Sequence, residues 1–178
     1  TGILTQYILE KNIPNFKIIE IDTESVNYLL KHFADIEKQV IEADFLHTKL
    51  DDLFTEPFSL VGNFPYNISN QILFKVYENR QQVVEVVGMF QKEVAERIAA
   101  KPGSKTYGIL SALLQAYYDI EYLFTVNEDV FNPPPKVKSG VIRLIRNNVE
   151  KLDCNEALYK TVIKTAFNQR RKTVGNAL

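Results

Sequence analysis

Apolar residues in this chain fall into short runs that are separated by amphipathic stretches. Runs of four to eight apolar or β-branched residues, bounded by turn-forming residues, are typical of buried strands. The sequence predicts strands at residues 16–21, 39–41, 58–61, 83–90, 122–126 and 140–145.

The stretches between these strands carry apolar residues at helical spacing. They predict helices at residues 24–33, 69–77, 91–100 and 107–118, with a further helix starting near Asn155. Asp22 or Thr23 is expected to cap the first of these helices, and Asn67 or Ser69 the second. Strands that alternate with helices predict an α/β fold, with a layered, mostly parallel sheet and helices on both faces.

Composition sets the broad class of the protein. With 178 residues, 46% hydrophobic and 24% charged, the chain is long enough for a globular core and one main domain. We expect a soluble, cytoplasmic protein with no membrane association, because no apolar run approaches the roughly 20 residues of a membrane helix and no leader pattern opens the sequence. Cys154 is the single cysteine and is interpreted as an inert thiol, so neither a disulfide nor a metal site is predicted.

Charge is distributed unevenly along the chain. The net charge is −1, yet ten of the 21 Lys and Arg residues follow Asn132, together with only three of the 22 Asp and Glu residues. A local basic surface is sufficient to neutralise phosphates and release counterions, so this end is a candidate nucleic-acid surface. A solvated basic helix is the alternative interpretation.

Two acidic residues follow predicted strands, where ligands bind in open α/β sheets. Glu20 ends the first strand after a glycine turn at Gly2, and such an acid can accept two hydrogen bonds from a ribose diol. Asp44, next to Phe45, can accept from the exocyclic amine of an adenine. Each also has a simpler explanation, as an exposed strand end for Glu20 and as a helix cap for Asp44.

The stretch Asn63-Phe64-Pro65-Tyr66 is harder to explain as a structural turn. Adenine N6 is a poor nucleophile because its lone pair is delocalised into the ring. The Asn63 amide oxygen and the Phe64 carbonyl can each accept one N6 hydrogen, which favours a tetrahedral nitrogen with a free lone pair. Pro65 fixes the backbone, and Tyr66 offers a face on which the base can stack.

Five segments together resemble the small-subunit (16S-type) rRNA adenine N6,N6-dimethyltransferases. The resemblance runs nearly end to end and rests on the order of the motifs, which lie at residues 63–69, 91–97, 104–111, 131–139 and 167–173. It implies a Rossmann-like fold and the cofactor S-adenosyl-L-methionine. The implied reaction is dimethylation of two adjacent adenosines in small-subunit rRNA during ribosome biogenesis, with the pre-30S particle as partner and the protein as a monomer.

The resemblance also assigns site residues. The residues that it implies for cofactor binding are Gly2, Glu20, Ile21, Asp44, Phe45 and Asn63, and those for catalysis are Asn63, Phe64, Pro65 and Tyr66. The residues implied to contact the target adenine are Tyr66 and Phe131. The residues implied to bind RNA are Lys136, Lys138, Arg170, Arg171 and Lys172. The resemblance divides the chain into a catalytic domain at residues 1–146 and the start of a helical RNA-binding region at 147–178.

The sequence departs from the family pattern at its ends. It begins at the last glycine of the expected Gly-x-Gly-x-Gly loop and stops before the helical domain is complete, with Gly175 where an arginine is usual, so we expect a fragment. Two alternatives stay open, a large-subunit rRNA methyltransferase of the macrolide-resistance type and a non-catalytic ribosome-assembly factor. A nicotinamide dehydrogenase is set aside, because hydride transfer needs no amine-binding motif.

Overall fold

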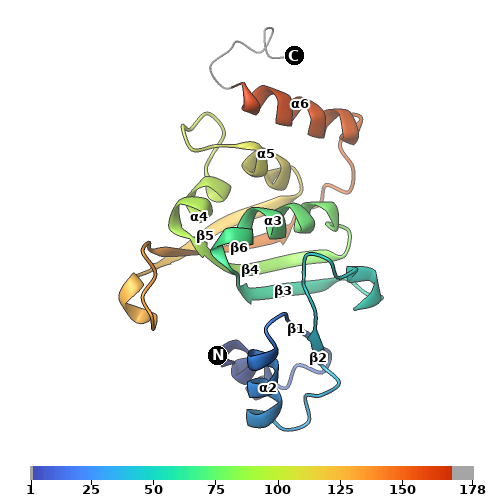
Figure 1. Ribbon diagram of the computed structural model, residues 1–178. Helices are drawn as coiled ribbons and strands as arrows, with labels where there is room; N and C mark the ends of the chain where they lie inside the picture. Colours follow the sequence, from blue (N-terminus) through green and yellow to red (C-terminus); the bar gives the residue numbers. More distant parts are fainter. Residues whose placement is uncertain (1, 170–178) are drawn as a thin grey trace. The chain divides into compact units, whose positions relative to one another are not determined.

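The computed structural model describes residues 2–169, and these residues form two compact units that divide between Thr55 and Glu56 (Figure 1). Each unit is described by itself. Within residues 2–169 there is no helix with the length and apolar character needed to span a membrane.

The first unit is a small α/β arrangement. Its elements are α1 (Ile3–Glu10), β1 (Ile18–Glu20), α2 (Thr23–His32), β2 (Val40–Glu42) and the short 3₁₀ helix η1 (Leu50–Asp52). β1 and β2 pair in parallel, with Ile18 opposite Val40. Asp22 caps α2 by accepting a 2.9 Å hydrogen bond from the Ser25 amide, as the sequence predicted.

The second unit contains a four-stranded sheet in the order β3-β4-β6-β5. The strands are β3 (Phe58–Asn63), β4 (Val83–Gln91), β5 (Tyr118–Val126) and β6 (Ser139–Arg146). The helical elements are η2 (Tyr66–Ile68), α3 (Ser69–Glu78), α4 (Lys92–Ala99), α5 (Ile109–Gln115), η3 (Glu128–Val130) and α6 (Glu156–Asn168).

The predicted predominance of parallel strands is wrong for this sheet. β3 and β4 are parallel and are joined through α3, but β4 with β6 and β5 with β6 are antiparallel. An apolar run has the same composition in either direction, so the direction depends on the connection. The β5–β6 connection at residues 127–138 contains only η3 and returns the chain antiparallel to β5.

Helices cover the sheet in successive layers (Figure 1). α4 packs on β5 and β6, α5 packs on α3 and α4, and α6 packs on α5. The core between the sheet and the helices is mainly apolar, with Leu73, Val76, Phe90, Leu113 and Ile142 all below 2% exposed. Burial of such side chains is the main favourable contribution to folding.

Two local predictions are corrected. Neither Asn67 nor Ser69 caps α3: Ile68 occupies the N-cap position without a side-chain bond, because η2 runs directly into the helix. The helix predicted at residues 107–118 is α5, which ends at Gln115. β5 begins at Tyr118 instead of 122, because the buried Tyr118 belongs to the sheet and donates its hydroxyl to the Val83 carbonyl at 2.7 Å.

Candidate functional site

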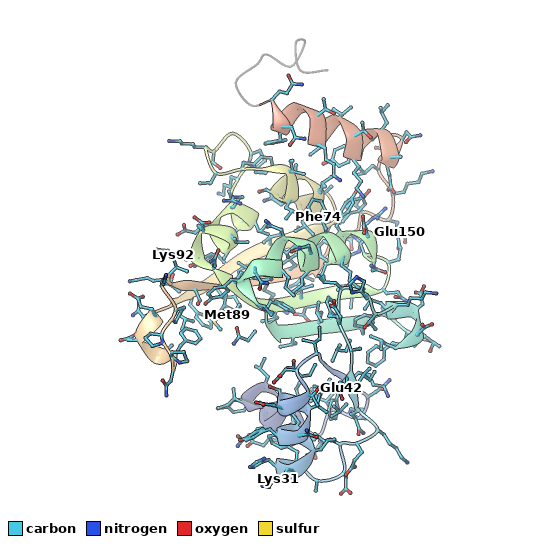
Figure 2. The ribbon with its side chains drawn as sticks, viewed as in Figure 1. Lys31, Glu42, Phe74, Met89, Lys92 and Glu150 are labelled. Carbon is cyan, nitrogen blue, oxygen red and sulfur yellow. The ribbon has the colours of Figure 1, made fainter. Side chains whose placement is uncertain are left out.

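Asn63 is the last residue of β3, and the chain turns sharply after it. Its backbone pairs with Met89 of β4, and the Phe64 amide reaches the Met89 carbonyl at 3.4 Å. Met89 and the start of α4 at Lys92 are labelled in Figure 2. Pro65 has φ −58° and ψ 132°, the extended kink expected of proline before a 3₁₀ turn. The Asn63 side chain is exposed and makes no hydrogen bond to another residue among 2–169, so its amide is available to a ligand.

The Phe64 ring holds this turn against the sheet. Gly62 and Gly88 lie opposite each other on β3 and β4, and the buried ring lies over both of them. A Cβ at Gly62 would lie 2.6 Å from the ring, and one at Gly88 would lie 2.5 Å from it. Phe90 flanks the ring at a centroid distance of 5.2 Å. The glycine pair therefore makes room for the ring, and the ring fixes the backbone on either side of it.

The structure brings Tyr66 and Phe131 to one cavity, although they lie far apart in sequence. Asn63, Phe64, Pro65 and Tyr66 line it from the β3 side. Phe131, Pro133 and Pro135 line it from the β5–β6 connection. The cavity is open and has a volume of about 290 Å³, near the lower end of the range for ligand sites. Two aromatic residues beside an exposed amide suit a flat ring that carries an amine.

Tyr66 is also tied to the sheet through its hydroxyl. Its Oη lies 2.5 Å from the Oγ of Ser139, which is fully buried at the start of β6. The sequence assigned no role to Ser139, Gly62 or Gly88. A glycine inside a strand is a known signal for a close approach of another group, and that signal could have identified the pair at 62 and 88. No local signal identifies Ser139.

Two of the predicted RNA-binding lysines lie beside this cavity. Lys136 and Lys138 are exposed, and they follow directly after the prolines that line the cavity. The carbonyl of Lys138 accepts a 2.9 Å bond from the Lys92 amide at the start of α4, which holds this end of the connection in place. The other three predicted RNA-binding residues, Arg170, Arg171 and Lys172, lie outside the described residues.

Glu20 ends β1 in the first unit, and its carboxylate is held by the backbone. Its Oε1 accepts from the amides of Ile21 at 2.9 Å and Asp22 at 3.0 Å, which leaves Oε2 for a ligand. Ile21 is 66% exposed and provides apolar surface next to the acid. Gly2 has φ +79°, and a Cβ there would meet the Phe33 ring at 2.9 Å. An oriented acid and a glycine turn in the left-handed region fit a ribose-containing cofactor.

Asp44 is engaged in local hydrogen bonds. Its Oδ1 accepts from the Leu46 amide at 2.8 Å, and its Oδ2 lies 2.7 Å from His47 Nδ1. These contacts belong to a turn at residues 45–47, and no helix follows it directly, so the helix-capping explanation given from the sequence is wrong. Each carboxylate oxygen has a second lone pair, so binding of an adenine amine by Asp44 stays a prediction. Phe45, next in the chain, is half-buried.

Asp22, at the start of α2, has a shifted pKa. The side chain and then the amide of Ser25 hold the pKa of Asp22 below its usual range, because both donate to the charged form. The Asp22 carboxylate is therefore ionised at neutral pH, and its negative charge interacts favourably with the positive, N-terminal end of the α2 dipole.

Comparisons with known proteins identify the family. The family described as ribosomal RNA adenine dimethylase matches residues 1–178. Ribosomal RNA small subunit methyltransferase A of Cytophaga hutchinsonii is 60% identical over 177 residues, which is 99% of this chain and 69% of that protein. The protein of the same name in Phocaeicola vulgatus is 58% identical over 178 residues, 99% of this chain and 63% of that protein. The chain thus spans about two thirds of the length of these relatives.

Solved structures agree on the fold. A dimethyladenosine transferase from Plasmodium falciparum superimposes with a TM-score of 0.76 at 27% identity, covering 97% of this chain and 63% of the other. The 23S rRNA methyltransferase ErmE superimposes with the same TM-score at 24% identity, covering 99% of this chain and 70% of the other, a likeness of fold alone. These likenesses confirm the α/β, Rossmann-like class predicted from the sequence. The chain belongs to the ribosomal RNA adenine dimethylase family.

Proposed function

We propose that the protein transfers methyl groups from S-adenosyl-L-methionine to N6 of two adjacent adenosines in small-subunit rRNA. Family membership and the names of the similar bacterial proteins support this function. The observation that carries it is the cavity in which the Asn63–Tyr66 turn meets Phe131. We place this activity in the cytoplasm, on the pre-30S particle, with the protein acting as a monomer.

The turn would activate the target amine. The Asn63 amide oxygen and the Phe64 carbonyl accept the two N6 hydrogens, so the N6 lone pair leaves the ring system and points away from both acceptors. The cofactor, when bound, supplies an electrophilic methyl group. N6 forms the new bond to the methyl carbon as the carbon–sulfur bond breaks, and N6 then loses one proton to solvent. The buried Phe64 ring keeps its carbonyl fixed, so the acceptors do not have to reorganise during the reaction.

The aromatic residues would hold the base. Tyr66 and Phe131 line the same cavity and can contact an adenine that has left its stack. Stacking on one aromatic ring is worth roughly 1–3 kcal/mol per base, which offsets part of the cost of unstacking. Lys136 and Lys138 would contact the neighbouring phosphates.

The cofactor residues proposed in the first unit are Gly2, Glu20, Ile21, Asp44 and Phe45. The free oxygen of Glu20 would accept from the ribose hydroxyls, and the exposed Ile21 would cover part of the cofactor. We also propose that residues 147–178 begin a helical RNA-binding region. In support, α6 lies after the last strand and packs on α5, outside the sheet.

The test is methyl transfer by a protein with the full length of its relatives, hereafter the full-length protein. It is incubated with unmethylated small subunits and labelled S-adenosylmethionine, and the label is mapped on the rRNA. Label on two adjacent small-subunit adenosines is expected. Label only on large-subunit rRNA would favour the macrolide-resistance type of activity, and stable particle binding without label would favour the assembly-factor alternative.

Asn63→Ala tests the amine contact directly. Loss of one of the two acceptors should lower single-turnover methylation by about 10²–10³-fold, as for other preorganised polar contacts to a transition state. Asn148→Ala, an exposed asparagine after β6, is the matched control and should retain the full rate. An unchanged rate in Asn63→Ala would refute the proposed mechanism.

A further inference from the structure

A side-chain hydrogen bond joins one cavity-lining residue to the strand that follows the other lining segment. It connects Tyr66 Oη in η2 to Ser139 Oγ at the start of β6, 73 positions later, at 2.5 Å. Ser139 directly follows the connection that carries Phe131 and the cavity prolines. The bond therefore lies between the segment that holds Asn63 and the segment that holds Phe131.

The serine end of this bond is rigid. Ser139 is 0% exposed, and its backbone pairs with Gln91 of β4 on one side and Val126 of β5 on the other. Strands that pair on both sides leave a residue little freedom, and the Lys92–Lys138 backbone bond adds a further constraint. The Ser139 hydroxyl is thus a fixed point in the sheet.

The tyrosine end has more freedom. Tyr66 belongs to a single 3₁₀ turn, its side chain is half-buried, and one face of its surroundings is the open cavity. The backbone places the Cβ atom of Tyr66, but two side-chain torsions decide the plane of its ring. A hydrogen bond at the far end of the ring restricts both torsions together.

We propose that Ser139 is a positioning residue for methyl transfer: it holds the hydroxyl of Tyr66 and thereby sets the plane on which the target adenine stacks. This inference rests on the proposed function. The base must present N6 to the Asn63 and Phe64 acceptors, so a tilt of the stacking plane moves N6 away from them. Small misplacements of a reacting group cost rate even when binding is retained.

The expected effect follows from the strength of one neutral hydrogen bond. A typical net value changes an equilibrium by about three- to tenfold, so loss of the bond should populate other ring orientations to that extent. In Ser139→Ala one hydroxyl is removed while the backbone of the residue stays paired with Gln91 and Val126, so we expect the fold to be retained. In Tyr66→Phe the stacking ring is retained and only the hydroxyl is lost.

The test is a double-mutant cycle in the full-length protein with unmethylated small subunits at saturating cofactor. Ser139→Ala and Tyr66→Phe should each lower single-turnover methylation about three- to tenfold, and the double variant should be no slower than either one. Cofactor affinity should be unchanged. Ser111→Ala is the control, because Ser111 is equally buried and its hydroxyl donates to the Arg97 carbonyl at 2.6 Å in the helical layer. It should lower the melting temperature without changing the rate.

A second readout does not depend on activity. In protein with labelled tyrosine, NMR should show the Tyr66 ring more mobile in Ser139→Ala than in the parent protein. Unchanged ring order, or a double variant whose rate loss is the product of the two single losses, would overturn the inference. A parent protein that methylates no RNA would instead contradict the proposed function, and the ring measurement would still report on the hydrogen bond.

Discussion

At the scale of single residues, the turn after β3 depends on the packing of the Phe64 side chain against two glycines. Phe64 lies over Gly62 and Gly88, and its burial fixes the carbonyl that is proposed to accept from N6. The four residues 63–66 therefore have different roles. The side chains of Asn63 and Tyr66 line the cavity, the Phe64 ring packs the turn against the sheet, and Pro65 sets the backbone direction after Phe64.

Gly88→Ala tests this anchor. The new Cβ would lie 2.5 Å from the Phe64 ring, so the ring must move, and such overpacking should lower the free energy of unfolding by about 1–3 kcal/mol. Urea denaturation of the purified chain measures this. Gly108→Ala is the control, because its Cβ would lie 3.6 Å from the Arg97 side chain and 3.9 Å from the Thr106 carbonyl, both ordinary contacts. Equal losses in the two variants would contradict the anchoring role.

At the scale of secondary-structure elements, α6 is held to the rest of its unit by an ion pair at its first residue. Glu156 lies 2.5 Å from Arg80, and both side chains are largely buried, at 27% and 16% exposed. Arg80 also lies over the Tyr117 ring at 4.4 Å. The nearby Tyr117 hydroxyl, the Leu152 amide and the Arg80 guanidinium hold the pKa of Glu156 below its usual range.

Because the pKa of Glu156 is lowered in the folded protein, the free energy of unfolding should decrease as the pH falls. The Glu156 carboxylate stabilises the fold above the unfolded pKa of about 4.3, and the contribution is lost as the pH falls through the lower folded value. Glu156→Gln should therefore lower the free energy of unfolding by about 1–2 kcal/mol at pH 7, and the difference from the parent should shrink as the pH falls below the unfolded pKa. Urea titrations across a pH series measure it. The exposed Glu150 gives the matched control Glu150→Gln, and a pH-independent loss in Glu156→Gln would argue against the ion pair.

At the scale of the whole molecule, two of the ten basic residues that follow Asn132 belong to the segment that also lines the proposed target site. Lys136 and Lys138 follow the cavity prolines and are exposed. Phosphate contacts supply affinity without sequence information, and each one contributes about 0.7–0.9 to the log–log salt slope.

Replacement of Lys136 and Lys138 by alanine should flatten the salt dependence of small-subunit binding. If both lysines contact phosphate, the slope should fall by about 1.4–1.8 in the full-length protein. Binding across a salt series measures it. Lys31 and Lys49 are exposed lysines of the first unit and provide the paired control. An unchanged slope would mean that the two lysines are only solvated, the alternative already raised for this charge.

A feature of the fold or of the candidate site could be predicted from the sequence when it depends on residues that are close together in the chain. The α/β class, most elements and the position of Asn63 at a strand end follow from periodicity and turn residues, which act over a few positions. The meeting of Tyr66 with Phe131 followed from motif resemblance. The antiparallel direction of β6 could not be predicted, because an apolar run has the same composition in a parallel and in an antiparallel strand. The hydrogen bond between Tyr66 and Ser139 could not be predicted either, because no local sequence pattern indicates that a buried serine bonds to a residue 73 positions away.

The Phe64 ring and the two glycines beneath it occupy one shared volume, and this has a consequence for how the family can diverge. A lineage that keeps phenylalanine at position 64 cannot accept a side chain at position 62 or 88 without displacing the ring. A smaller residue at 64 would relieve the contact at position 62, whereas alanine at 88 would still meet the Phe90 ring at 2.8 Å. The order of substitutions is therefore constrained: a smaller residue at 64 must precede a side chain at 62, and a side chain at 88 requires both rings, Phe64 and Phe90, to give way. Positions 62, 64, 88 and 90 should covary across relatives, although the two glycines lie 26 positions apart.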